Sequence, residues 1–207
     1  MRIGIIGSGH IGGTAAQLFA EAGHEVAIAN SRGPETLTEL VEEIGPNARA
    51  ATVADAASFG EIVLVAIPFG GYRELPVAPL EGKIVVDANN YYPGRDGVFP
   101  ELEDDSTTST ELLAEHLAGA HVVKAFNSML WSTLRDRRNP DAREDRLVVF
   151  VAGNDAEAND TVSKLIDEIG FTAVVTGDLA KGGRLQQRDG PLYGKELTQA
   201  EAEEALA

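Results

Sequence analysis

The feature of this sequence that most constrains its fold is a glycine-rich loop between an apolar run and a helical pattern near the N-terminus. Residues 3–6 (Ile-Gly-Ile-Ile) predict a buried strand, residues 7–12 (Gly-Ser-Gly-His-Ile-Gly) form the loop, and the helical pattern ends at Gly23. A second apolar run, at residues 26–29, completes a strand–loop–helix–strand unit of about 30 residues. This context makes the Gly-x-Gly-x-x-Gly pattern a specific indication of a dinucleotide site.

Each glycine of the loop has a physical task. Gly7 permits a tight turn, Gly9 lets the backbone approach a pyrophosphate, and Gly12 lets the helix pack closely on the strand. The free N–H groups at the start of the helix, and the positive end of its dipole, would hold the phosphates. We therefore expect the loop to bind pyrophosphate through Gly7, Ser8, Gly9, His10, Ile11 and Gly12, although His10 is equally compatible with a solvent-facing position.

The end of the second strand indicates which dinucleotide is bound. An NAD site carries Asp or Glu about 20 residues beyond the glycines, where the carboxylate holds the ribose hydroxyls and repels a 2′-phosphate. This sequence has the uncharged Asn30, followed by Ser31 as a hydroxyl donor and Arg32 as a planar cation suited to phosphate. We interpret the three residues as an NADP(H) site. The alternative is that Arg32 is an ordinary exposed arginine and the site accepts either coenzyme.

Composition excludes several classes of function. The net charge of −16, from 33 acidic and 17 basic residues, disfavours nucleic acid and anionic membranes as partners. Without cysteine, the chain has no disulfide, thiolate metal site or cysteine nucleophile. No apolar run approaches the ~20 residues of a membrane span, and the first core strand leaves no room for a signal peptide. We expect a cytoplasmic protein.

The remaining pattern predicts an α/β fold, a doubly wound parallel sheet of the Rossmann type with a small C-terminal α/β extension. We expect an NADP-binding domain at 1–127 and a smaller lobe at 128–207. Helices are expected at residues 34–44, after a capping box at 108–111, before Gly170 and after Thr198, whereas 135–146, 181–184 and 186–194 are expected to be irregular. Further strands are expected at residues 49–52, 62–67, 83–87, 121–127, 147–151 and 171–176.

Candidate site residues are those that follow the strands, because ligands of open parallel sheets lie outside the carboxyl ends. These positions are rich in Asn, Tyr and Gly, and they hold no Ser-His-Asp set, metal-spaced cluster or carboxylate pair. We therefore assign no catalytic residue and no metal, and we expect chemistry carried by bound cofactors that the protein positions. The residues are Ser8 to Ile11, Asn30 to Arg32, Pro68 to Tyr72, Asn89 to Tyr92, Asn127 and Ser128.

Four residues have alternative interpretations. Lys124 lies in an apolar strand, so it must either be paired or point into the cleft. Pro68 ends a buried strand and would also form a wall for a nicotinamide ring. Tyr91 and Tyr92 would stack on a ligand ring or cover apolar surface.

These residues resemble the coenzyme F420-dependent NADP oxidoreductase family. The resemblance is carried by residues 3–12, 30–32, 65–68, 85–89 and 122–127, and the Val-Lys-Ala-Phe-Asn segment is also similar to the NADPH-binding domain of membrane metalloreductases. It implies a two-lobed homodimer whose cleft brings the nicotinamide face to face with a deazaflavin or flavin ring. By position, Ser31 and Arg32 would hold the 2′-phosphate, and Ile67 and Pro68 would flank the nicotinamide, with Asn127 nearby.

The C-terminal segment 183–193 differs from the part that walls the deazaflavin in F420 enzymes and is closer to the metalloreductase version. The expected function is therefore hydride transfer between NADP(H) and coenzyme F420 or a flavin such as FMN or FAD, in either direction. One alternative is an NADP(H)-binding sensor without turnover. Another is a reductase of a small carbonyl or imine, which would need a proton donor among Lys124, Tyr72, Tyr91 and Tyr92.

Overall fold

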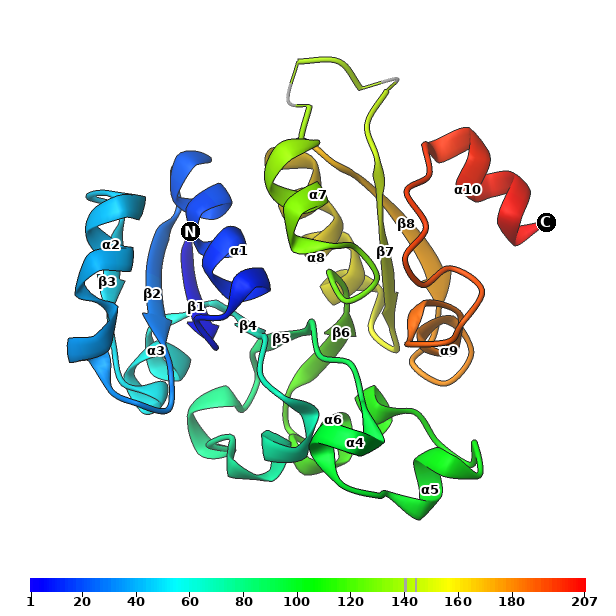
Figure 1. Cartoon of the computed structure of the whole chain (residues 1–207), viewed down its shortest axis with the longest axis horizontal. Coiled ribbons are helices and arrows are strands. Elements are labelled where there is room, and N and C mark those ends of the chain that lie inside the picture. Colours follow the sequence, from blue (N-terminus) through cyan, green and yellow to red (C-terminus); the bar gives the residue numbers. More distant parts are fainter. Residues whose placement is uncertain (140, 144) are drawn as a thin grey trace.

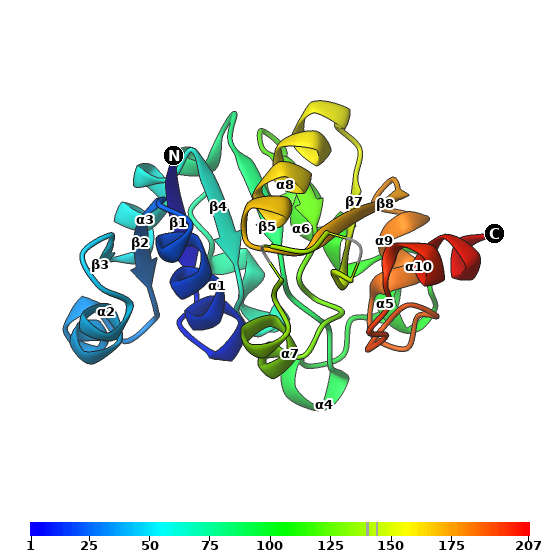
Figure 2. The same ribbon diagram turned by 90° about the horizontal axis from the view of Figure 1, so that it is seen from above.

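The computed structural model describes residues 1–139, 141–143 and 145–207. Within them, strands form one sheet in the order β3-β2-β1-β4-β5-β6-β7-β8, which runs from left to right in Figure 2. Neighbouring strands are parallel except β6 and β7. The strands are β1 Arg2–Ile6, β2 Glu25–Ala29, β3 Ala48–Ala50, β4 Ile62–Val65, β5 Ile84–Asp87, β6 His121–Lys124, β7 Val148–Gly153 and β8 Thr172–Gly177.

Helices cover both faces of the sheet (Figures 1 and 2), so the predicted α/β doubly wound class is confirmed. Three short 3₁₀ helices accompany them: η1 Pro34–Leu37, η2 Phe69–Glu74 and η3 Ala78–Leu80. The α-helices are α1 His10–Glu21, α2 Thr38–Ile44, α3 Val53–Phe59, α4 Pro93–Asp96, α5 Pro100–Glu103, α6 Ser109–His116, α7 Trp131–Asp136, α8 Ala156–Glu168, α9 Gly182–Gln186 and α10 Gln199–Leu206.

Each face of the sheet has its own core. On one face, α1 and α8 pack through residues such as Phe19 and Leu165 onto strand residues such as Ile5. On the other face, α6 and η2 pack through Leu113 and Phe69. Because the central strands are buried on both faces, their sequences read as continuous apolar runs rather than alternating ones.

The C-terminal strands extend the same sheet. β7 pairs antiparallel with β6 over Val123↔Gly153 and Lys124↔Ala152, and β8 pairs parallel with β7 through the crossover helix α8. The segment that follows covers the outer part of this extension, where Leu192 and Ala202 pack on Phe150. In Figure 1, α2 and β3 therefore lie at one end of the molecule and α10 at the other.

Local sequence signals explain where several helices begin. Thr108 and Glu111 form the predicted capping box at the start of α6, and Thr198 forms another with Glu201 before α10. Asp155 caps α8 by accepting hydrogen bonds from two backbone N–H groups. These caps satisfy donors that would otherwise lack partners.

Three predictions of irregular structure or boundaries were wrong. Helix α7 occupies the start of the expected loop 135–146, of which Pro140 and Glu144 lie outside the described residues, and α9 lies in the expected irregular segment. Strand β3 is centred earlier than expected. Helix α3 had no expected counterpart, although Thr52 caps it through the backbone N–H of Asp55.

The contact between α1 and the end of β1 generates a stability prediction. A Cβ at Gly12 would overlap the carbonyl oxygen of Gly7, whereas a Cβ at Gly9 would meet no atom within 4 Å. Gly12→Ala should therefore lower the free energy of unfolding by at least the ~1–3 kcal/mol typical of overpacking. Gly9→Ala, the matched control, should change it by less than ~1 kcal/mol. Equal losses in urea unfolding would contradict the close contact.

Candidate functional site

The phosphate-loop candidate lies between β1 and α1, at the carboxyl end of β1. Gly7 adopts a φ of +112°, and its N–H donates to the carbonyl of Ala29 at 2.8 Å. Gly9 is exposed, and no side chain caps the start of α1. The loop therefore presents backbone and a helix N-terminus to the outside, the arrangement that suits a bound phosphate.

Asn30 organises the loop that follows β2. Its Oδ1 accepts hydrogen bonds from the backbone N–H groups of Arg32 (2.9 Å) and Gly33 (3.0 Å), which is an Asx turn. Its Nδ2 donates to Ser8 Oγ at 3.2 Å and to Thr36 Oγ1 at 3.0 Å. The uncharged Asn30 side chain thus links the ends of β1 and β2, and it fixes the backbone conformation at Arg32.

The Arg32 side chain is exposed. Among the ion pairs of residues 1–139, 141–143 and 145–207, none involves Arg32. Ser31 beside it is also exposed. The end of β2 therefore offers a cation and a hydroxyl group. Position 30, where an NAD site would carry a carboxylate that repels phosphate, is occupied by an uncharged asparagine.

A stacked pair of rings borders the phosphate loop. The His10 imidazole lies on the Trp131 indole with ring centroids 4.5 Å apart and planes inclined by 13°, and Arg135 lies 4.8 Å from the Trp131 ring centroid. A cavity of about 410 Å³ between α1, α2 and α7 includes Ser8, Gly9 and Trp131 in its lining. His10 is thus exposed, with one face of its ring stacked on Trp131 of α7.

The turns after β4 and β5 are joined by Asn89. Its Oδ1 accepts the backbone N–H of Ile67 at 2.8 Å, and its side chain is buried. Ile67 is half-buried and Pro68 is exposed, so both remain accessible at the carboxyl end of β4. Two residues predicted from separate strand ends, Ile67 and Asn89, are therefore in direct contact.

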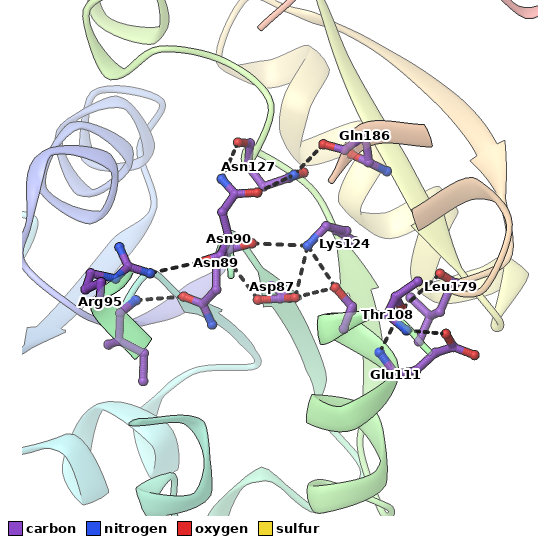
Figure 3. A network of polar contacts seen from close by, with 12 residues as sticks. Asp87, Asn89, Asn90, Arg95, Thr108, Glu111, Lys124, Asn127, Leu179 and Gln186 are labelled. Carbon is purple, nitrogen blue, oxygen red and sulfur yellow. Dashed lines mark hydrogen bonds and ion pairs between the residues drawn. The ribbon is translucent and has the colours of Figure 1, made fainter. Parts of the chain in front are cut away.

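A buried ion pair lies beside Asn89 (Figure 3). Lys124 Nζ lies 3.4 Å from Asp87 Oδ2, and it donates to Thr110 Oγ1 at 2.8 Å and to the carbonyl of Asn89 at 3.1 Å. The Thr110 hydroxyl in turn donates to Asp87 Oδ2, at 2.5 Å. Both charged side chains are at most 1% exposed. Of the two alternatives for Lys124, the paired one is correct.

A second set of amides joins the end of β6 to the C-terminal segment (Figure 3). Asn90 Nδ2 donates to the carbonyl of Asn127 at 2.8 Å, and Asn127 Nδ2 donates to the carbonyl of Gln186 at 2.7 Å and to Asn90 Oδ1 at 3.1 Å. Phe126, buried just before Asn127, has a φ of +63°, which is rare for a bulky residue. This turn brings Asn127 to the shared edge of the sheet.

Three tyrosines considered as proton donors already have partners. Tyr72 is 2% exposed and stacks on Phe69, and burial raises its pKa. Tyr91 donates to Glu103, and its pKa is raised mainly by desolvation. The Tyr92 hydroxyl lies 2.7 Å from that of Tyr193. The hydroxyls of Tyr91 and Tyr92 are therefore both engaged in hydrogen bonds within the chain.

Tyr92 also connects the two halves of the chain. The guanidinium groups of Arg95 and Arg188 lie 4.8 Å and 5.1 Å from the centroid of its ring. Burial and the hydrogen bond with Tyr92 raise the pKa of Tyr193 to about 12, so the Tyr193 hydroxyl keeps its proton near neutral pH. We call Tyr92, Tyr193 and the two arginines the tyrosine clasp.

A cavity of about 590 Å³ lies beside the clasp, between the segment after β5 and the C-terminal segment. Its lining combines the Tyr91 ring, Leu102 and two prolines with arginines and carboxylates. The arginines already have partners, because Arg184 bonds Asp105 at 3.0 Å and Arg188 lies 3.3 Å from Asp189. The volume is in the range of small-molecule sites.

In the described part of the chain, no group of His, Asp and Glu residues has the arrangement of a metal site. No helix in that part is long and apolar enough to span a bilayer.

Comparison with known proteins identifies the family. The sequence profile described as NADP oxidoreductase, coenzyme F420-dependent, matches residues 2–91. A solved structure from Arthrobacter sp. FB24, provisionally assigned as an F420-dependent NADP reductase, is 31% identical, covers 88% of each chain and has a TM-score of 0.74. The chain belongs to the coenzyme F420-dependent NADP oxidoreductase family.

Two other relatives of this F420-dependent oxidoreductase family member are informative. The hypothetical protein SMa0349 of Sinorhizobium meliloti is 33% identical, covers 96% of this chain and 95% of that one, and has a TM-score of 0.80. Metalloreductase STEAP3 of Rattus norvegicus is 28% identical over 188 residues, which are 89% of this chain but 36% of STEAP3. The chain thus spans about a third of that curated relative. Both predicted resemblances are confirmed.

The sequence did not reveal every residue of this family member's site. Asp87 and Thr110 were missed, although a charged residue at the end of the strand beside Lys124 was a signal for the first. Trp131 and Tyr193 were missed as contacts of His10 and Tyr92, because no sequence spacing relates partners so far apart.

The tyrosine clasp generates a prediction about coupling between the two halves. Tyr92→Phe and Tyr193→Phe each remove one hydroxyl but keep the ring, so each should lower the free energy of unfolding by about 0.5–1.5 kcal/mol. The double variant should lose less than the sum of the two, because the hydroxyls bond to each other. Chemical denaturation of the four proteins measures this. Strictly additive losses would show that the two hydroxyls do not stabilise each other.

Proposed function

We propose that this member of an NADP-dependent oxidoreductase family transfers hydride between NADP(H) and coenzyme F420 or a flavin such as FMN or FAD. The observation that carries the proposal is the open glycine loop facing an exposed Arg32 on a turn whose Asn30 carries no charge. When bound, the coenzyme supplies the hydride chemistry, and the protein supplies binding, orientation and exclusion of water.

The adenosine side of the coenzyme fits the first two strand ends. Backbone N–H groups from Ser8 to Ile11 would hold the pyrophosphate, because space is open around Gly9. Ser31 and Arg32 would hold the 2′-phosphate by a hydroxyl hydrogen bond and a charge-assisted contact. The link from Asn30 to Ser8 supports this, since it joins the two phosphate-binding elements.

The nicotinamide side fits the ends of β4, β5 and β6. Ile67 and Pro68 would form one wall, with Asn89 and Asn127 behind it. Asn89 Nδ2 and Asn127 Oδ1 are buried and lack hydrogen-bond partners in the described residues. Buried unpaired amide atoms are uncommon, and a carboxamide bound at this edge would offer both a donor and an acceptor to them.

The hydride partner would enter from the 590 Å³ cavity. A flat ring fits beside Tyr91 and Leu102. The cavity's two arginines face three carboxylates, Glu103, Asp105 and Asp189, so its lining favours the uncharged ring of a deazaflavin or flavin over a phosphate tail. The likeness to STEAP3, named a metalloreductase, supports testing ferric chelates alongside these acceptors.

The contacts of the four candidate proton donors disfavour reduction of a small carbonyl or imine. Lys124 is buried and paired with Asp87, and Tyr72 lies in the core. The hydroxyls of Tyr91 and Tyr92 bond Glu103 and Tyr193. Transfer between two redox rings needs no such donor, because the proton of the reduced ring can come from water. The alternative is a sensor that binds NADPH without turnover, and the absorbance assay below distinguishes it from hydride transfer.

The acceptor is tested by mixing the purified protein with NADPH and F420, FMN, FAD or a ferric chelate, each alone, and with the ferric chelate together with FMN or FAD, and following absorbance. We expect NADPH oxidation at a catalytic rate with F420 or with a flavin. Oxidation with the ferric chelate only in the presence of flavin would favour a metalloreductase-like function. Binding of NADPH without oxidation by any of the four would reject hydride transfer in favour of a sensor.

Coenzyme selectivity depends on the charge at position 32. Arg32→Glu should weaken NADPH binding at least tenfold more than NADH binding, because a carboxylate repels the 2′-phosphate. Lys164→Glu, an equal charge change at an exposed site on α8, is the matched control and should affect both little. Isothermal titration calorimetry measures all four affinities. A similar loss for both coenzymes in Arg32→Glu would count against the phosphate assignment.

The quaternary structure and location also belong to this proposal. By analogy with the family, we propose a homodimer in the cytoplasm. Light scattering coupled to size-exclusion chromatography should give a mass of about twice the 21.9 kDa of the chain. A mass equal to one chain at all concentrations would reject the dimer.

A further inference from the structure

The buried ion pair between β5 and β6 holds the backbone of a single residue, Asn89, through both its N–H and its C=O. Asp87 Oδ1 accepts the backbone N–H of Asn89 at 3.0 Å, and Lys124 Nζ donates to the carbonyl of Asn89 at 3.1 Å. The Thr110 hydroxyl joins the two charges, since it accepts from Lys124 and donates to Asp87. The backbone N–H and C=O of Asn89 are therefore both fixed by charged groups (Figure 3).

Because the backbone of Asn89 is fixed, the position of its side chain is also fixed. Its Oδ1 accepts the N–H of Ile67 at 2.8 Å, at the turn after the neighbouring strand β4. A chain of contacts thus runs from the ion pair, through Asn89, to the Ile67–Pro68 turn. Every group before Ile67 is at most 2% exposed, so solvent does not compete for these bonds.

Stability alone gives a weak reason for these two charges. Removing two charges from water carries a large desolvation penalty, and an apolar pair of similar volume is often as stable or more so. Asp87 and Lys124 are register partners on adjacent parallel strands. The two preceding pairs of register partners on these strands are apolar. A buried pair at this place is better explained by the orientation that it imposes on its neighbours.

We propose that Asp87, Lys124 and Thr110 are positioning residues that set the Ile67–Pro68 turn through Asn89, and thereby the wall against which a nicotinamide ring would rest. The identity of the ring rests on the proposed function. The positioning of the turn does not, because it depends only on contacts within the chain. Lys124 consequently acts through Asn89 and does not contact the reacting atoms.

The test compares variants that preserve the side-chain volume at these positions but remove the hydrogen bonds or charges that hold Asn89. Thr110→Val removes the bridging hydroxyl, and Thr110→Ser is the conservative control that retains it. A double variant, Asp87→Asn with Lys124→Met, removes both charges together and so avoids leaving one of them buried and unpaired. Three quantities are measured: amide hydrogen exchange at Ile67 by NMR, the affinity for 2′,5′-ADP, and kcat and KM with NADPH and the acceptor identified in the absorbance assay.

The proposal predicts faster exchange at Ile67, by tenfold or more in the double variant and by a smaller factor in Thr110→Val, with Thr110→Ser close to the parent protein. It predicts a parallel fall in kcat, whereas the affinity for 2′,5′-ADP stays within twofold because the adenosine side is untouched. Without turnover in the parent protein, the proposed function fails, and exchange at Ile67 still decides the positioning role.

Two results would overturn the inference. One is unchanged exchange at Ile67 in a folded double variant. The other is a double variant that does not fold, together with a Thr110→Val protein identical to the parent in exchange and kinetics. The second result would mean that the ion pair serves the fold alone.

Discussion

The close approach of α1 to the end of β1 is the constraint on which the rest of the structure depends. No side chain fits at Gly7 or Gly12, because a Cβ at either would overlap a backbone carbonyl. The missing side chains allow the chain to reverse within a few residues and start a helix whose N-terminus faces outward. Gly9, between them, has open space around it. The same loop thus combines a packing constraint with an accessible backbone, as a phosphate-binding loop requires.

The parallel strands bring the remaining polar groups to the same edge. Hydrogen bonds link neighbouring strand ends in turn: Asn30 with Ser8, Asn89 with Ile67, and Asn90 with Asn127. Amide side chains suit this task because each offers both a donor and an acceptor without a charge. In a chain with a net charge of −16, an exposed Arg32 beside the uncharged Asn30 is a local feature that favours an anionic coenzyme.

The sequence predicted the first half of the fold well because its signals are local. The glycine loop, the apolar runs and the Thr108 capping box each depend on neighbouring residues, and the structure places them where expected. The predicted C-terminal strands also exist, but the antiparallel pairing of β7 with β6 could not be deduced from apolar runs. Helix α7 was missed because its charged and polar residues resemble those of a solvated loop.

For the candidate site, the sequence predicted which residues end the strands but not how they contact one another. The contact of Asn89 with Ile67 spans 22 positions and that of Tyr92 with Tyr193 spans 101, so no periodic pattern relates them. Lys124 illustrates the limit: its burial required a partner, but only the sheet register identified Asp87. Long-range pairing, rather than residue type, was the missing information.

The central claim is that the end of β2 selects a coenzyme carrying a 2′-phosphate. Calorimetric titration of the unmodified protein with NADPH and with NADH tests it most directly, and repetition at higher salt reports the electrostatic part of the selectivity. The account predicts that NADPH binds at least about a hundredfold more tightly, as expected for a charge-assisted phosphate contact worth roughly 3 kcal/mol, and that the advantage shrinks with salt. Equal affinities for the two coenzymes, or binding of neither, would contradict it.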